Sequence, residues 1–130
     1  MLALTLLLLC SSVLATEPDR KVRMVAERAA RLMPGTTGFL CVMPKRAEIA
    51  KTVGQTTDGI GYAKSKKQAL IIYCPDPEFG SRVIRLAFAM VKPRSLSGMV
   101  VVCAVGKERD GYIRSVVEAT GAKLYVEPVP

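Results

Sequence analysis

The sequence predicts a single small α/β domain of about four mostly parallel strands flanked by helices, a Rossmann-like or flavodoxin-like sandwich that follows an N-terminal leader. Three observations predict this class. Helical and strand-like segments alternate along the 130 residues, the strand-like segments are continuously apolar, and helix-length connections separate them. Continuous apolar runs are typical of strands that are buried on both faces, as in parallel sheets. The order of the strands does not follow from the sequence.

Four short apolar segments are the expected strands. Residues 39–43 (FLCVM), 70–74 (LIIYC) and 99–105 (MVVVCAV) are apolar throughout, and residues 123–127 (KLYVE) are followed closely by Pro128. Turn-forming residues bound these segments, as they commonly bound strands.

Four segments with apolar residues at helical spacing are the expected helices. Asp76 and Pro77 give the clearest start signal, because an Asp caps the first N–H groups and a Pro needs no N–H partner in the first turn. Gly54 is the expected end of the second helix, since glycine favours the backbone that ends helices. The expected helices cover residues 17–33 after the cap Thr16, a segment that starts after Pro44 and stops at Gly54, residues 78–91 and residues 112–120.

Residues 54–68 (GQTTDGIGYAKSKKQ) fit the alternating pattern poorly. Connections between a helix and a strand usually take about 2 to 6 residues, and this segment is longer. We expect a surface loop that carries a basic cluster of Lys64, Lys66 and Lys67. A small hairpin that turns at residues 58–59, or an extra helical turn, is an alternative.

The first fifteen residues (MLALTLLLLCSSVLA) are uncharged and apolar, and a polar segment follows directly. This stretch is shorter than the roughly 20 residues of a membrane-spanning helix. Small residues at Val13 and Ala15 are typical of a cleavage site, although no basic residue opens the segment. We therefore expect a signal peptide over residues 1–15, cleavage after Ala15, a mature domain over residues 16–130 without a transmembrane helix, and a secreted or periplasmic location. An uncleaved anchor, or an N-terminal strand of an intracellular protein, is the alternative.

Charge and composition restrict the functions that this chain can perform. The 19 basic and 11 acidic residues give a formal net charge of +8, which favours contact with anionic partners. The chain has no histidine, which excludes Ser-His-Asp and Cys-His catalytic sites and imidazole zinc ligands. It also lacks closely spaced aromatic residues of the kind that stack on RNA bases. We predict no cofactor, no resident metal and no sequence-specific nucleic-acid motif.

Three cysteines occupy similar places in three expected strands. Cys41, Cys74 and Cys103 each lie near the C-terminal end of a strand and are followed three residues later by Pro or Gly. Two of them on neighbouring strands would be candidates for a disulfide, and all three together would offer thiolate ligands. The simplest alternative is that all three are buried, because free cysteine packs as a small hydrophobic residue.

Charged residues follow the same expected strand ends, where sites form in open parallel sheets. Lys45, Arg46 and Lys107 lie near helix starts and are candidates for anion binding, since a bound anion would offset the repulsion between these cations and the helix dipole. Asp76 and Glu108 are candidate catalytic carboxylates.

The leading functional hypothesis is a small exported binding or assembly module with a basic surface for an anionic or protein partner. The alternative is a thiol-dependent enzyme at the C-terminal edge of the sheet, with Cys74 as nucleophile at a helix start and Asp76 or Glu108 as carboxylate. A thiolate metal carrier is a third hypothesis. The sequence predicts no particular oligomeric state.

Overall fold

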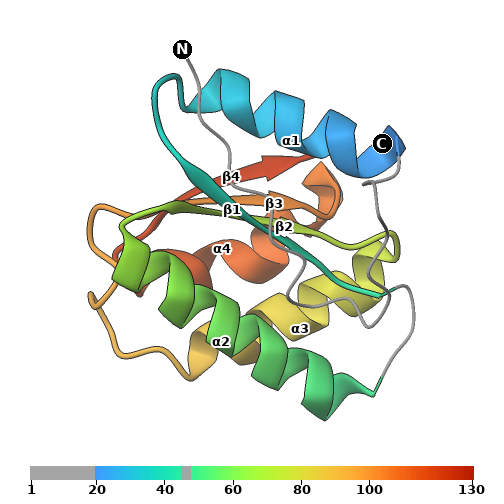
Figure 1. Ribbon diagram of the computed structural model, residues 1–130. Coiled ribbons are helices and arrows are strands. Elements are labelled where there is room, and N and C mark those ends of the chain that lie inside the picture. Colours follow the sequence, from blue (N-terminus) through green and yellow to red (C-terminus); the bar gives the residue numbers. More distant parts are fainter. Residues whose placement is uncertain (1–19, 45–47) are drawn as a thin grey trace.

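The computed structural model describes residues 20–44 and 48–130 (Figure 1). The predicted leader with its cleavage site, the cap Thr16 and the candidate anion-binding residues Lys45 and Arg46 lie outside these ranges. The elements in chain order are α1 (Arg20–Leu32), β1 (Gly38–Val42), α2 (Ile49–Lys66), β2 (Ala69–Tyr73), α3 (Pro77–Ala89), β3 (Val100–Ala104), the 3₁₀ turn η1 (Lys107–Arg109), α4 (Asp110–Glu118) and β4 (Lys123–Glu127).

The four strands form one parallel sheet in the order β1-β2-β3-β4, which confirms the predicted α/β class. Helices α2, α3 and α4 cover one face of this sheet and α1 lies on the other (Figure 1). In the chain order each helix precedes a strand. Because the strands are parallel, all four helices end near the edge at which the strands begin. We call this the amino edge, and the opposite edge the carboxyl edge.

The main core lies between the sheet and the three helices α2, α3 and α4. Side chains that point to this face from all four strands are fully or nearly fully buried, including Phe39, Leu70, Val101 and Leu124. The opposite face packs Leu40, Ile71 and Val102 against the apolar side of α1. Burial on both faces explains why the strands are continuously apolar. The main core residues contributed by the helices are Ile60, Ala63, Val83, Ile84, Ala87, Phe88, Ile113 and Val117.

The second helix is longer than the sequence suggests, and the predicted surface loop over residues 54–68 is wrong. Helix α2 continues through Gly54 to Lys66 and ends at Lys67, which has a left-handed backbone and donates its N–H to the carbonyls of residues 63 and 64. Its buried residues are Thr52, Thr56, Gly59, Ile60 and Ala63, and their helical spacing explains why the chain does not stop at Gly54. The Thr56 hydroxyl is satisfied inside the helix, because it donates to the carbonyl of Thr52 at 2.8 Å.

Helix α3 is apolar around most of its circumference, and it lies in the middle of the three-helix face (Figure 1). Its inner side is buried in the main core, whereas Leu86 and Met90 on the outer side are 48% and 70% exposed. Within residues 20–44 and 48–130, no helix combines the length and apolar character needed to cross a bilayer.

Candidate functional site

Asp76 begins helix α3 in the way that the sequence predicts. Its carboxylate accepts a hydrogen bond from the N–H of Phe79 at 3.2 Å, and Pro77 occupies the first helical position. A capping carboxylate typically stabilises a helix by about 1 kcal/mol. Capping is therefore sufficient to explain Asp76, and its role as a catalytic carboxylate stays a prediction.

The three cysteines point to the same face of the sheet but do not meet. Cys41 and Cys103 are both in register with Ile72, which lies on the strand between them. Two strand spacings separate their Cα atoms by about 9.6 Å, which is too far for a disulfide between them. Cys74 comes directly after the end of β2, two residues beyond Ile72, so it does not share their row. Cys41 is disulfide-bonded, whereas Cys74 and Cys103 are free and buried.

The surroundings of Cys74 disfavour a thiolate. Burial raises the pKa of this thiol from an ordinary 9.0 to about 11, although backbone N–H groups at the start of α3 act in the opposite direction. Its Sγ lies 3.8 Å from the carbonyl oxygen of Pro44, to which the thiol donates. Burial also raises the pKa of Cys103, to a greater extent. A nucleophilic cysteine requires the opposite shift, so the geometry gives no support to the catalytic hypothesis for Cys74.

The free thiols should be protected from alkylation in the native protein. We expect iodoacetamide at about pH 7.5 to leave Cys74 and Cys103 unmodified until the chain is unfolded, because both thiols are buried and protonated. Since the folded pKa of Cys74 lies above its ordinary value, the thiol's contribution to stability is complete below about pH 9 and is lost as the pH rises toward 11. Peptide mass spectrometry after timed alkylation measures the protection of each thiol, and denaturant unfolding between pH 8 and 11 measures the loss of stability. Rapid native modification of Cys74, with Cys103 unmodified as the internal control, would restore Cys74 as a candidate nucleophile.

A shallow hollow of about 320 Å³ lies at the carboxyl edge. It brings Lys107 and Glu108 together with Pro77 and the C-terminal residues Pro128 and Val129. Neither Cys74 nor Asp76 lines it, so the three proposed catalytic residues do not share one cavity in the described part of the chain. The strand order contains no reversal, and it is such a reversal that opens a ligand crevice at the carboxyl ends of doubly wound sheets. Among residues 20–44 and 48–130, no group of three Cys, Asp or Glu side chains is placed to hold a metal ion.

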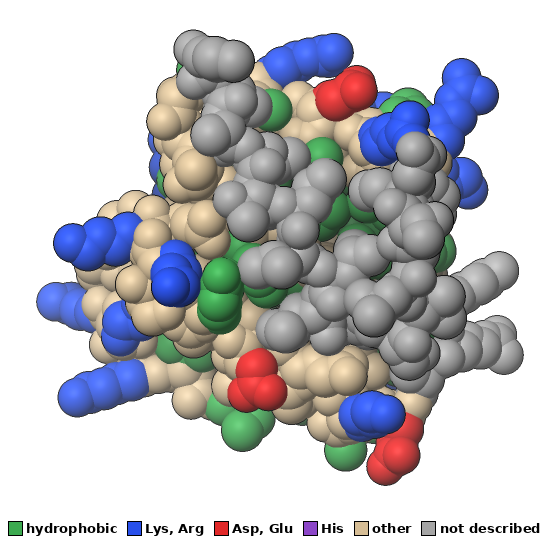
Figure 2. All heavy atoms as spheres, viewed as in Figure 1, with side chains coloured by type: hydrophobic (Ala, Val, Ile, Leu, Met, Phe, Trp, Pro, Cys, Tyr) green, Lys and Arg blue, Asp and Glu red, His purple; other side chains and the backbone are tan. Residues whose placement is uncertain are grey.

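The amino edge is strongly basic. Arg31 lies in the last turn of α1, and Lys64 and Lys66 in the last turn of α2. Figure 2 shows Lys and Arg side chains gathered on the left, which is the side on which α2 ends in Figure 1. Backbone hydrogen bonds tie the segment that follows α3 to the end of α4, where the N–H of Arg94 donates to the carbonyl of residue 119. We define the basic edge as Arg31, Lys64, Lys66, Lys67, Lys92, Arg94 and Lys123.

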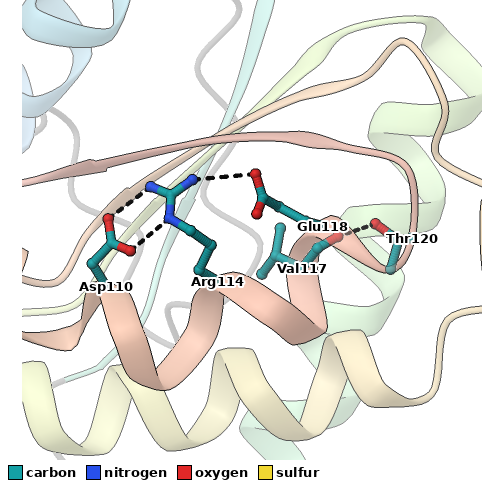
Figure 3. A network of polar contacts seen from close by, with 5 residues as sticks. All are labelled: Asp110, Arg114, Val117, Glu118 and Thr120. Atoms are coloured by element: carbon teal, nitrogen blue, oxygen red, sulfur yellow. Dashed lines mark hydrogen bonds and ion pairs between the residues drawn. The ribbon is translucent and has the colours of Figure 1, made fainter.

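The two carboxylates of α4 both pair with Arg114, on their own helix, and not with the cations of the basic edge. Arg114 donates to both carboxylate oxygens of Asp110 at 2.6 and 2.7 Å and to Glu118 at 3.2 Å (Figure 3). The guanidinium holds the pKa of Asp110 below its ordinary value through these hydrogen bonds. Glu118 lies at the amino-edge end of α4, but it is already engaged by Arg114 and does not pair with the lysines of the basic edge in the described structure.

A cavity of about 470 Å³ opens within the basic edge, between the end of α2 and the segment that follows α3. We call it the amino-edge cavity. The lysines of this cavity are recognisable in the sequence as a basic cluster, but the cavity itself is not, because residues 92–100 lie about thirty positions away from them and only the fold brings the two segments together. The lining residues are Thr36, Ala63, Lys64, Lys67, Gln68, Ala69, Ser95, Leu96, Ser97, Gly98, Met99 and Val100.

Two cations of the basic edge have an unusual backbone. Lys67 (φ 54°) and Arg94 (φ 62°) are the non-glycine residues with positive φ in the described part of the chain. The left-handed conformation costs roughly 1 to 2 kcal/mol for a residue with a Cβ atom, and glycine normally occupies such positions. Both strained positions therefore hold a long cation where glycine would fit better.

Comparison with protein-family models, with curated proteins and with solved structures finds no match to this chain. The functional proposal consequently depends on the geometry of the two edges of the sheet.

Proposed function

We propose that this protein is a binding module that holds an anionic partner on its basic edge. The observation that carries the proposal is the pair of strained cations, Lys67 and Arg94, at one end of the molecule. Backbone strain that a glycine would relieve is commonly found where a protein binds its ligand. At these two positions the strain keeps an ammonium and a guanidinium where glycine would give a more stable chain.

The distribution of charge supports an anionic partner. Cations at helix C-termini complement the helix dipole, which is a sufficient reason for lysines in the last turn of α2. Lys92 and Arg94 lie beyond the end of α3, where the dipole has little effect, and both are exposed. A cluster of exposed cations without paired carboxylates produces a positive potential that attracts anions over about one Debye length, roughly 8 to 10 Å in physiological salt.

The partner that fits is one with repeated anionic groups, because the cations come from the ends of three helices and the start of β4. Acidic polysaccharide, a nucleic-acid backbone, anionic lipid head groups and an acidic protein face share this chemistry. Heparin is a convenient probe for it, since its charges are dense and regularly spaced.

Substituting glycine at the strained positions should separate binding from stability. We expect Lys67→Gly and Arg94→Gly each to raise the free energy of unfolding by about 0.5 to 1 kcal/mol, because the relief of left-handed strain exceeds the entropy cost of glycine. The same variants should elute from a heparin column at lower salt, because each has lost a cation of the basic edge. Denaturant unfolding and heparin chromatography measure the two effects.

Lys51→Gln is the matched control, because Lys51 is an exposed lysine at the opposite end of α2. It removes the same charge without changing the basic edge. If the glycine variants elute with this control, net charge alone determines heparin binding and the proposal is wrong. If the glycine variants unfold more easily than the parent protein, Lys67 and Arg94 are not strained. The observation that carries the proposal is then wrong.

A further inference from the structure

We propose that the amino-edge cavity binds a small amphiphilic anion, a single anionic group on a short apolar body. This inference deepens the proposed function and rests on it, since the basic edge surrounds the cavity. A volume of about 470 Å³ lies within the range of small-molecule sites, roughly 300 to 1,000 Å³. The cavity thus has room for a ligand much larger than an inorganic ion.

The two kinds of lining residue correspond to the two parts of such a ligand. Met99 and Val100 are half-buried and provide accessible apolar surface, and the buried Ala63 and Leu96 lie at the wall of the cavity as part of the main core. Lys64 and Lys67 provide two ammonium groups, and there is no carboxylate among the described residues that line the cavity. Apolar walls with a few placed polar groups are typical of small-molecule sites.

The serine hydroxyls of the cavity are already used within the protein. Ser95 Oγ donates to the carbonyl of Lys92 at 2.7 Å, and Ser97 Oγ donates to the carbonyl of Arg94 at 2.9 Å. These hydrogen bonds stabilise the segment that forms one wall of the cavity. Because both hydroxyl protons are used in this way, the charged donors available to an anion are the ammonium groups of the two lysines. The carbonyl end of α2 carries a partial negative charge, so an anion at this place depends on the two lysines.

Lys66 offers an internal comparison, because it belongs to the basic edge but not to the cavity. Its Nζ lies 5.9 Å from the centre of the Tyr62 ring. Lys64 and Lys67 line the cavity, although all three lysines are exposed and close in sequence. A ligand inside the cavity should therefore distinguish Lys66 from its neighbours, whereas a ligand spread over the surface should not.

The test is a calorimetric titration of the full chain with octanoate, octanol and acetate. We expect octanoate to bind most tightly, since octanol lacks the charge and acetate lacks the apolar body. Lys64→Gln and Lys67→Gln should each weaken octanoate binding about tenfold, which corresponds to the loss of one charge-assisted hydrogen bond. Lys66→Gln should change octanoate binding less than about threefold while lowering the salt at which the protein elutes from heparin.

Equal binding of octanoate and octanol, equal binding of octanoate and acetate, or equal effects of Lys66→Gln and Lys67→Gln would each overturn this inference. Thermal melting of every variant, followed by circular dichroism, distinguishes a loss of octanoate binding from unfolding of the variant. Heparin binding without octanoate binding would overturn the inference alone, and octanoate binding without heparin binding would overturn the proposed function.

Discussion

Replacing Gly80 by alanine is expected to lower the free energy of unfolding by about 2 to 3 kcal/mol. A Cβ atom at Gly80 would lie 2.6 Å from Cys74 Cβ, 3.2 Å from Cys74 Sγ and 3.3 Å from Val105 Cγ1. These atoms belong to two neighbouring buried strand ends, so neither can move without disturbing the sheet. Overpacking of this kind should outweigh the gain of up to about 1 kcal/mol that alanine brings to a helix. Denaturant unfolding of the variant measures the difference.

Gly61→Ala is the control for this prediction, because a Cβ atom at Gly61 of α2 would meet nothing within 4 Å. The same substitution there should raise the free energy of unfolding by about 0.5 to 1 kcal/mol through helix propensity alone. The change in the free energy of unfolding should thus have opposite signs in the two variants. If Gly80→Ala also stabilised the protein, α3 would not be packed against Cys74 as closely as the structure shows.

Replacing Leu70 by alanine should have the largest effect of the substitutions considered, a loss of about 3 kcal/mol in the free energy of unfolding. Leu70 lies in the second strand of the sheet with an exposed fraction of 0%. Its neighbours in register are Phe39 on β1 and Val101 on β3, and both point into the same main core. Removing its side chain leaves a void that close-packed neighbours cannot fill. Denaturant unfolding at fixed protein concentration gives the value.

Leu86→Ala removes the same atoms from the outer side of α3, where the side chain is 48% exposed. We expect a change within about 0.5 kcal/mol. If Leu70→Ala and Leu86→Ala lowered the free energy of unfolding by equally small amounts, the assignment of Leu70 to the core would be contradicted. A large loss at Leu86 would instead indicate that another molecule covers the outer side of α3.

Local signals were sufficient wherever a single short segment determines its own conformation. The strand over residues 123–127 and the start of α3 at Asp76 and Pro77 agree with the structure residue by residue. Apolar runs bounded by turns, and an acceptor followed by proline, have few alternative conformations. These signals predicted the α/β class without knowledge of the strand order.

Local signals failed at the second helix. Glycines at positions 54, 59 and 61 favoured a loop, because glycine lowers helix propensity by about 1 kcal/mol. Burial of Ile60 and Ala63 against the sheet outweighs that cost. A sequence window contains the propensity but not the packing surface, so tertiary contacts reversed the prediction. Lys64 and Lys66 consequently lie on a helix, and Lys67 caps its end.

The sequence by itself determined the excess of positive charge, the absence of imidazole chemistry and the alternation of helices with apolar strands, because composition and local pattern are properties of the chain. Tertiary structure decided which of these residues meet. The order β1-β2-β3-β4 places Cys41 and Cys103 on either side of β2 and separates the sulfurs whose similar positions suggested one site. Because all the strands run parallel, each helix returns the chain to the amino edge. Lys67 and Arg94, distant in sequence, therefore belong to one basic surface there. Which residues become neighbours depends on how the strands pair, and pairing is determined by contacts between segments far apart in the chain.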